Sequence, residues 1–257
     1  MIFYKTKEEV ERIRSSAEIL GKTHGEVAKW IKPDVETKQL DQIAEEYIKD
    51  HGGIPSFKGY RGYSSTLCVS VNENVVHGIP GGYRLKEGDI VSVDCGVYFQ
   101  GFHSDSAYTY PVGQVEDKVK KFLSVTKESL NKGIEAAVSG SRIGAIGYAI
   151  QNFVQKEGYS VVRELVGHGI GKNLHEGPEV PNYGKRGEGV KLGEGLVIAI
   201  EPMINMGKKN VVQEMDGWTI RTADRSLSAH YEHTVVIWKD KTEVLTTFKY
   251  IEEHIKF

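Results

Sequence analysis

The sequence contains only two cysteines, Cys68 and Cys95, among its 257 residues. Two thiols are too few for a disulfide scaffold or a thiolate zinc site, and they favour a reducing compartment. Long apolar runs are also missing, since the longest, 196–200, is far shorter than the roughly 20 residues needed to cross a bilayer. Residues 1–9 turn charged early and lack a signal-peptide core. These absences predict a cytoplasmic protein with no membrane segment.

A strong charge of either sign is absent as well. The formal net charge is −2, from 33 basic and 35 acidic side chains, which provides no broad attraction for nucleic acid. Two specific sequence motifs are absent. Residues 167–172 lack the spacing of a phosphate-binding loop, and no His-Glu-x-x-His helix occurs. With 39% hydrophobic residues, the chain is nevertheless long and apolar enough to bury a sizeable core.

Helical and extended segments follow each other in the same order twice. Apolar residues at helical spacing predict helices over residues 6–31, 37–52, 115–138 and 143–158. Strand-like segments are predicted at 64–71, 89–110, 161–170, 196–204 and 229–246. An offset of 106 residues pairs Leu40 with Ile146 and Tyr47 with Phe153. This weak duplication, without a Pro- or Ser-rich linker, predicts two similar halves sharing one sheet.

Three acidic residues interrupt segments that should be buried. Asp94 lies inside the apolar run 90–98, Glu201 ends the run 196–200, and Glu232 precedes the run 234–237. Burying an ionised carboxylate costs several kcal/mol unless a cation or a set of hydrogen bonds compensates. These acids therefore need a partner.

Two further residues extend the set. A hairpin turn at Gln100-Gly101 would bring Asp105 nearly opposite Asp94, and His168 stands between two glycines. Four carboxylates and one imidazole suit two divalent ions, with manganese, iron or cobalt favoured. Spacing alone leaves plainer readings open: solvent-facing aspartates, a surface glutamate paired with neighbouring histidines, and a histidine in a turn.

Six ordered motifs carry a resemblance to a known family. They are residues 72–80 (Asn-Glu-Asn-Val-Val-His-Gly-Ile-Pro), 89–96 (Asp-Ile-Val-Ser-Val-Asp-Cys-Gly), 101–105 (Gly-Phe-His-Ser-Asp), 167–171 (Gly-His-Gly-Ile-Gly), 175–178 (His-Glu-Gly-Pro) and 200–202 (Ile-Glu-Pro). In order and spacing, over nearly the whole chain, they resemble the bacterial-like type I methionine aminopeptidases.

The resemblance implies an α+β fold of the pita-bread type. In this fold two pseudo-symmetric helix-helix-strand halves form one curved, mainly antiparallel sheet with helices on its outer face. We expect a single catalytic domain over residues 1–257, with halves at approximately 6–110 and 114–246. The weak duplication described above agrees with that architecture.

The resemblance also implies a metal-dependent exopeptidase that removes the initiator methionine when the second residue is small. Asp105 and Glu232 would bridge two divalent ions of cobalt, manganese or iron, with zinc as an alternative. A metal-activated hydroxide would attack the first peptide bond while Glu201 shuttles the proton, His175 binds the oxyanion and His77 orients the substrate. The full set of implied metal ligands is Asp94, Asp105, His168, Glu201 and Glu232.

A substrate pocket and further partners follow from the same motifs. The implied pocket residues are Phe57, Tyr60, Tyr63, Cys68, His77, Leu174, His175 and Trp218. A monovalent cation is implied at Asn72, Asn74 and Ser228. The expected partners are nascent polypeptide N-termini and peptides beginning with Met, with transient ribosome association. We expect a monomer without a direct nucleic-acid site.

Two other functions remain as alternatives. One is a proline-directed aminopeptidase of the same fold. The other is a non-catalytic protein-binding module, which the retention of all five metal ligands argues against.

Overall fold

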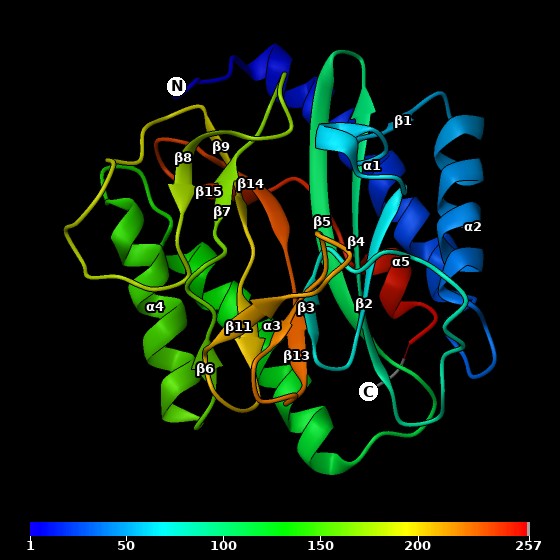
Figure 1. The fold of residues 1–257 in the computed structure, drawn as a ribbon. Helices are drawn as coiled ribbons and strands as arrows, with labels where there is room; N and C mark the ends of the chain where they lie inside the picture. The colour runs from blue at the N-terminus through cyan, green and yellow to red at the C-terminus, as the bar shows by residue number, and fades with distance from the viewer. Residues whose placement is uncertain (256–257) are drawn as a thin grey trace.

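The computed structural model describes residues 1–255, and in it helices flank a set of antiparallel strands. Figure 1 shows α2 at one edge of the molecule and α4 at the other, with the strands between them. The five helices run over Lys7–Ala28 (α1), Thr37–Asp50 (α2), Asp117–Ala136 (α3), Ile143–Lys156 (α4) and Lys249–Glu252 (α5) among the described residues. None of these is long and apolar enough to cross a membrane.

Helix α1 begins where its sequence provides a complete N-terminal cap. The Thr6 hydroxyl accepts a hydrogen bond from the Glu9 amide, and the Glu9 carboxylate accepts one from the Thr6 amide. The helix ends at Ala28, three residues before the predicted boundary at residue 31. Its buried face includes Val10 and Leu20, which are fully buried. The cap thus determines where the helix begins, and the burial of its apolar face stabilises the rest of it.

The long hairpin at the centre of Figure 1 consists of β4 (Ile90–Phe99) and β5 (Phe102–Pro111). Its turn is Gln100-Gly101, with φ angles of 51° and 86°. Positive φ at both central residues is typical of the type I′ turn, whose twist matches that of the flanking strands. The predicted turn is confirmed, and Phe99 pairs with Phe102 across it.

The remaining strands are short, and hydrogen bonding divides all of them into four sheets. One contains β1 (Ile54–Pro55) and β2 (Leu67–Val71) on either side of β4, with β5 beside it. A second contains β7 (Gly167–Gly169), β8 (Glu176–Val180), β9 (Leu196–Ile200), β14 (His233–Ile237) and β15 (Thr242–Val244). The third contains β6 (Ser160–Val161), β10 (Met203–Asn205) and β13 (Ser228–His230), and the fourth β3 (Asn74–Val76), β11 (Val211–Gln213) and β12 (Ile220–Thr222).

Breaks in the predicted strands position functional residues. The predicted strand 196–204 is interrupted at Glu201-Pro202, between β9 and β10. Proline has no amide hydrogen, so it cannot continue the hydrogen-bonded ladder. The predicted strand 229–246 is likewise divided, with Tyr231-Glu232 between β13 and β14. The two interruptions place the carboxylates of Glu201 and Glu232 at strand ends, where both line the same cavity.

The two halves of the chain have matching second helices. Helices α2 and α4 each contain 14 residues, and they begin and end 106 positions apart, the same offset that the sequence indicates. A continuous apolar core joins the halves. It includes Leu40 of α2, Ile146 of α4 and Ile198 of β9, all fully buried. The functional residues therefore lie on a rigid framework built from both halves.

Candidate active site and metal centre

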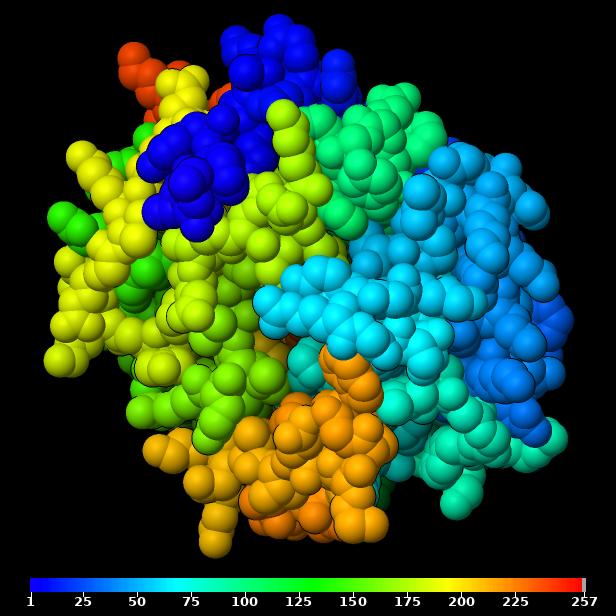
Figure 2. Space-filling view, turned by 45° about the horizontal axis from the view of Figure 1, so that its top comes forward, coloured from blue at the N-terminus to red at the C-terminus, as the bar shows by residue number. Residues whose placement is uncertain are grey.

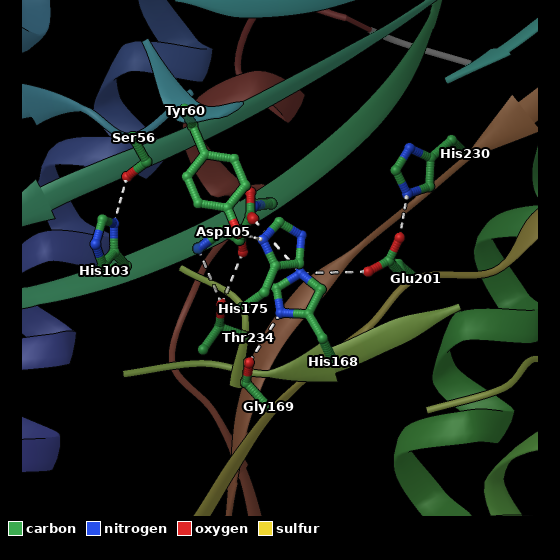
Figure 3. A network of polar contacts seen from close by, with 11 residues as sticks. Ser56, Tyr60, His103, Asp105, His168, Gly169, His175, Glu201, His230 and Thr234 are labelled. Atoms are coloured by element: carbon green, nitrogen blue, oxygen red, sulfur yellow. Dashed lines mark hydrogen bonds and ion pairs between the residues drawn. The ribbon is translucent and has the colours of Figure 1, made fainter. Parts of the chain in front are cut away.

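The five predicted metal ligands come from five places in the chain and meet at one cavity. Asp94 belongs to β4, Asp105 to β5 and His168 to β7, while Glu201 follows β9 and Glu232 precedes β14. One ligand atom each of Asp105, His168 and Glu232 lies within 4.8 Å of the others. His168 Nε2 is 3.6 Å from Glu201 Oε1 (Figure 3). All five residues line a cavity of about 310 Å³.

The register of the β4–β5 hairpin corrects one sequence prediction. We expected Asp94 and Asp105 to lie nearly opposite each other, but Asp105 pairs with Gly96 and Asp94 pairs with Ala107. The two-residue turn fixes this register. The aspartates are diagonal neighbours on the same face of the hairpin, because side chains two positions apart point the same way. They still reach the same site, but from successive steps of the ladder.

The carboxylates of the site are deeply buried together. Asp105 is 3% exposed and Glu232 is 2% exposed. Burial raises the pKa of Asp94 to about 7. It also raises the pKa of Asp105, which the negative charges of Glu232 and Asp94 raise further. The pKa of Glu201 is raised by burial and by Asp94 and Asp105. This cluster is therefore stable in its charged form only beside a cation.

His168 is oriented as a ligand by a hydrogen bond on the far side of its ring. Its Nδ1 lies 2.9 Å from the carbonyl oxygen of Gly169, which can only accept, so Nδ1 carries the hydrogen. The lone pair on Nε2 then faces the carboxylates. Burial lowers the pKa of His168 to about 4, which keeps the ring neutral near pH 7. A neutral imidazole with a free Nε2 is the form that binds a metal.

Unpaired oxygen atoms show that the residues present fit a metal. Asp94 Oδ1 and Glu232 Oε1 are buried without a hydrogen-bond partner. Among residues 1–255, no lysine or arginine forms an ion pair with any of the four carboxylates. Such groups cost several kcal/mol unless a cation compensates them. An oxygen-rich set with one imidazole suits manganese, iron or cobalt, so divalent ions fit this site.

Neighbouring polar groups hold the ligands in place between β5 and β14. The Thr234 hydroxyl accepts from the Asp105 amide at 3.1 Å and donates to the Asp105 carbonyl oxygen at 2.8 Å. The Glu232 amide donates to Ala107 O at 2.9 Å, and the Ser106 hydroxyl donates to Glu232 O at 3.0 Å. The sequence contained no signal for these contacts, because serine and threonine are common in strands.

His175 and His77 stand at the rim of the cavity. His175 Nδ1 is 3.0 Å from the Tyr60 hydroxyl, and its ring lies 4.1 Å from the ring of His168, between centroids (Figure 3). The Tyr60 ring stacks on His175 at 5.2 Å. His77 follows β3 with a φ of 58°, a left-handed conformation that is uncommon for residues other than glycine. Both imidazoles line the same cavity as the candidate ligands.

The predicted pocket residues line the same cavity as the metal ligands. Phe57, Tyr63, Cys68 and Leu174 are buried in one apolar cluster, with Tyr60 and Trp218 packed against it. The rings of Tyr63 and Trp218 meet edge to face at 5.0 Å. Figure 2 shows the opening between the segments around Tyr60, Leu174 and Trp218. The cavity thus has an apolar, aromatic wall next to a polar, acidic one.

The three residues expected at a monovalent cation lie elsewhere. Asn72 O accepts a hydrogen bond from the Ser228 amide at 2.9 Å, so these two are neighbours. The Asn72 side chain is engaged by Asp89 at 2.8 Å and by the Ile90 amide at 3.0 Å. Asn74 lies in β3 and pairs with Arg221 of β12. This cluster remains a predicted cation site.

Among the cavity residues that sequence reasoning missed is His230. It is 1% exposed, and neither ring nitrogen has a hydrogen-bond partner. Its Nε2 lies 3.8 Å from Glu201 Oε2, on the side away from His168 (Figure 3). Burial lowers its pKa to about 3. Only its position two residues before Glu232 could have indicated it, and the sequence assigned it no role beyond a neighbour of Glu232.

Comparison of this chain with known proteins shows which family has this fold and this site. A model of metallopeptidase family M24 matches residues 11–239. The chain belongs to that family. A solved prolidase from Pyrococcus furiosus shares the fold, with a TM-score of 0.78 at 24% identity over 95% of this chain and 65% of that one. The expected pita-bread fold is therefore confirmed.

More similar relatives narrow the class. Methionine aminopeptidase 1 of Bacillus subtilis is 51% identical over 96% of this chain and 99% of its own length. A solved methionine aminopeptidase from Rickettsia prowazekii has a TM-score of 0.95 at 40% identity, covering 96% of this chain and all of that one. Another from Thermotoga maritima has a TM-score of 0.94 at 43% identity, covering 96% and 100%. Within family M24, the chain groups with the methionine aminopeptidases.

Proposed function

We propose that this chain removes the N-terminal methionine from proteins and peptides whose second residue is small. One observation carries the proposal: a cluster of four carboxylates and one imidazole shares a cavity of about 310 Å³ with an apolar, aromatic pocket. Such a pocket suits a thioether side chain, which is flexible and polarisable. The names of its relatives support the same activity.

The metal centre proposed for this activity contains two divalent ions, of manganese, iron or cobalt, with zinc as an alternative. Asp94, Asp105, His168, Glu201 and Glu232 would hold these ions, and Asp105 and Glu232 would serve both of them. When bound, such ions lower the pKa of coordinated water and polarise a carbonyl group. The buried, unpartnered oxygens of Asp94 and Glu232 support this assignment.

Three side chains are proposed to act on the substrate. Glu201 takes a proton from the attacking water at a carboxylate oxygen and delivers it to the leaving nitrogen. His175 donates a hydrogen bond to the scissile carbonyl oxygen as negative charge develops there. Since Nδ1 of His175 faces the Tyr60 hydroxyl, its Nε2 is free for this role. His77 orients the first peptide nitrogen.

The methionine side chain is proposed to lie against Phe57, Tyr63, Cys68, Leu174 and Trp218, with Tyr60 at the mouth. Contact with this buried apolar wall would remove the methionine side chain from water. The expectation of a small second residue comes from the resemblance to the methionine aminopeptidases, and the stacked rings of Tyr60 and His175 line the same cavity.

Further proposals concern the molecule as a whole. We propose a single catalytic domain over residues 1–257, with halves at about 6–110 and 114–246, acting as a cytoplasmic monomer on nascent chains in transient contact with the ribosome. A monovalent cation at Asn72, Asn74 and Ser228 would stabilise the loop before β3, and the short contact between Asn72 O and the Ser228 amide supports that grouping.

The activity is tested with a Met-Ala-Ser peptide after the protein is chelated and then given Mn²⁺, Fe²⁺ or Co²⁺ in steps. We expect methionine release that depends on added metal and falls when alanine is replaced by leucine. Faster cleavage of an X-Pro dipeptide would favour a proline-directed enzyme. Absence of bound metal and of any cleavage would favour a non-catalytic module.

A further inference from the structure

A buried ion pair joins the first residues of the chain to the loop that contains His175. Lys5 Nζ pairs with Glu176 Oε2, and the two side chains are only 4% and 2% exposed. The residues are 171 positions apart, and Glu176 directly follows His175. Most of the other ion pairs in residues 1–255 lie at the surface, so a buried Lys–Glu pair beside a site residue needs a reason.

The pair is part of a larger set of contacts on this loop. Glu176 Oε1 accepts a hydrogen bond from the Asn173 amide at 3.2 Å, which closes the loop on itself. Lys5 Nζ also donates to Phe3 O at 3.3 Å, and the Lys5 amide donates to Gly195 O at 2.7 Å. The Gly177 amide donates to Met1 O at 3.0 Å. Residues 1–5 therefore hold the loop at Glu176 and Gly177, directly after His175.

The loop packs closely on the end of the Lys5 side chain at Gly171. A Cβ atom there would lie 2.4 Å from Lys5 Cε and 2.7 Å from Lys5 Nζ. The Gly171 carbonyl oxygen accepts from the His103 amide at 2.8 Å, on the opposite side. The loop is thus confined between β5 and Lys5. Figure 1 shows the first residues passing beside the upper end of β8, where this loop joins the strand.

We propose that Lys5, acting through Glu176, is a positioning residue for His175. Breaking the ion pair would free the 171–177 loop and let the His175 ring move relative to Tyr60 and His168. This inference rests on the proposed function, since His175 acts on the substrate there. A buried charge pair is suited to the task because it fixes one register, whereas apolar contacts tolerate sliding.

The loop also provides a matched control. Lys172 pairs with Glu9 at 3.3 Å, but its side chain is 68% exposed. This second pair also links the loop to the beginning of the chain. Exposed pairs contribute little, so Lys172→Met should break a second lysine–glutamate pair at the same loop without loosening it. Any general effect of loop charge would appear in both variants.

The test uses the variant Lys5→Met/Glu176→Gln, which removes both charges without leaving one buried alone. We expect kcat to fall by about tenfold, since misplacement of a reacting group by an ångström can cost up to a hundredfold, while KM changes by less than about twofold. Adding His175→Ala to this variant should cost far less than it costs in the parent protein. Lys172→Met should match the parent. If the factors by which kcat falls in Lys5→Met/Glu176→Gln and in His175→Ala simply multiplied in the combined variant, Lys5 would not act through His175.

A second readout does not depend on turnover. The imidazole resonances of His175 in the full chain loaded with diamagnetic Zn²⁺ should shift in Lys5→Met/Glu176→Gln and stay unchanged in Lys172→Met. Unchanged His175 resonances in both variants would overturn the inference even if turnover fell. If the parent protein released no methionine, the proposed function would fail, and the resonances alone would decide whether Lys5 positions His175.

Discussion

The chemistry of the site depends on residues whose charge states the fold controls. His168 and His230 are buried and neutral, while four carboxylates gather without a lysine or arginine partner in residues 1–255. Each side chain is ordinary by itself. Together they form a set of acceptors that only cations can satisfy, which is why this region of the core is polar.

His175 provides the most direct test at the residue scale. It contacts Tyr60 and His168 but is not among the proposed metal ligands. We expect His175→Ala to keep its metal and lose turnover by roughly 2.7 to 4 kcal/mol in activation free energy, the usual cost of removing an oxyanion donor. Steady-state kinetics beside metal analysis of the purified variant would check this. Normal turnover would contradict the assigned role.

At the scale of elements, the substrate pocket is built from segments far apart in the chain. Phe57 follows β1 and Leu174 lies in the loop before β8, yet both belong to one buried cluster that lines the cavity. Their side chains therefore share one volume. A change of size at one position should be compensated by an opposite change at the other.

We expect Phe57→Cys alone to leave a gap and Leu174→Phe alone to crowd the methionine side chain. Each should lower kcat/KM for Met-Ala-Ser, and the double variant should recover much of the loss. A double-mutant cycle measures the coupling. Simple addition of the two losses in free energy would mean that the residues do not share the pocket.

Helix α1 is joined to β5 by a buried histidine that makes the fold sensitive to acid. His24 Nε2 lies 2.9 Å from Ser106 O, and Nδ1 lies 3.2 Å from the Tyr110 hydroxyl. Burial lowers the pKa of His24 from 6.5 to about 4. The folded state therefore resists protonation that the unfolded chain accepts. The contribution of neutral His24 to the free energy of unfolding is complete above pH 6.5 and is lost as the pH falls from 6.5 towards 4.

This linkage predicts a loss of about 2 kcal/mol in the free energy of unfolding at pH 5 relative to pH 8, attributable to His24. His24→Gln keeps a donor for Ser106 O but has no such titration. Urea unfolding at both pH values should show a smaller loss for the variant by about that amount. Equal losses in the two proteins would exclude His24 as the cause.

At the scale of the whole molecule, the proposed metal ligands come from both halves of the chain. Asp94 and Asp105 come from the first half, while His168, Glu201 and Glu232 come from the second. Since the unfolded chain has no such site, metal binding should stabilise the folded state, by about 2.7 kcal/mol at a metal concentration of 100 times Kd.

We therefore expect the melting temperature of the chelated protein to rise when Mn²⁺ is added and to fall again when Mn²⁺ is removed. Asp105→Asn and Glu232→Gln should lose both this rise and the bound metal, because each removes a proposed bridging ligand. Differential scanning calorimetry with metal titration would measure both effects. Full metal occupancy in either variant would argue against a bridging role for that residue.

The sequence by itself determined the local features and the types of chemical group. The two-residue turn at Gln100-Gly101 and the beginning of the first helix near residue 6 depend on neighbouring residues, so pattern alone predicted them. Buried positions occupied by acids indicated a cation site for the same reason. These signals are local because backbone conformation and burial periodicity are set over a few residues.

The tertiary structure decided every contact between distant segments. It placed Asp94 and Asp105 as diagonal neighbours, joined Thr234 to Asp105 across 129 positions, left His230 without a partner and paired Lys5 with Glu176. Such pairings depend on register and on how helices and strands pack, and many registers satisfy the same apolar pattern. Only the assembled core selects one of them, because a single arrangement buries the apolar surface of both halves together.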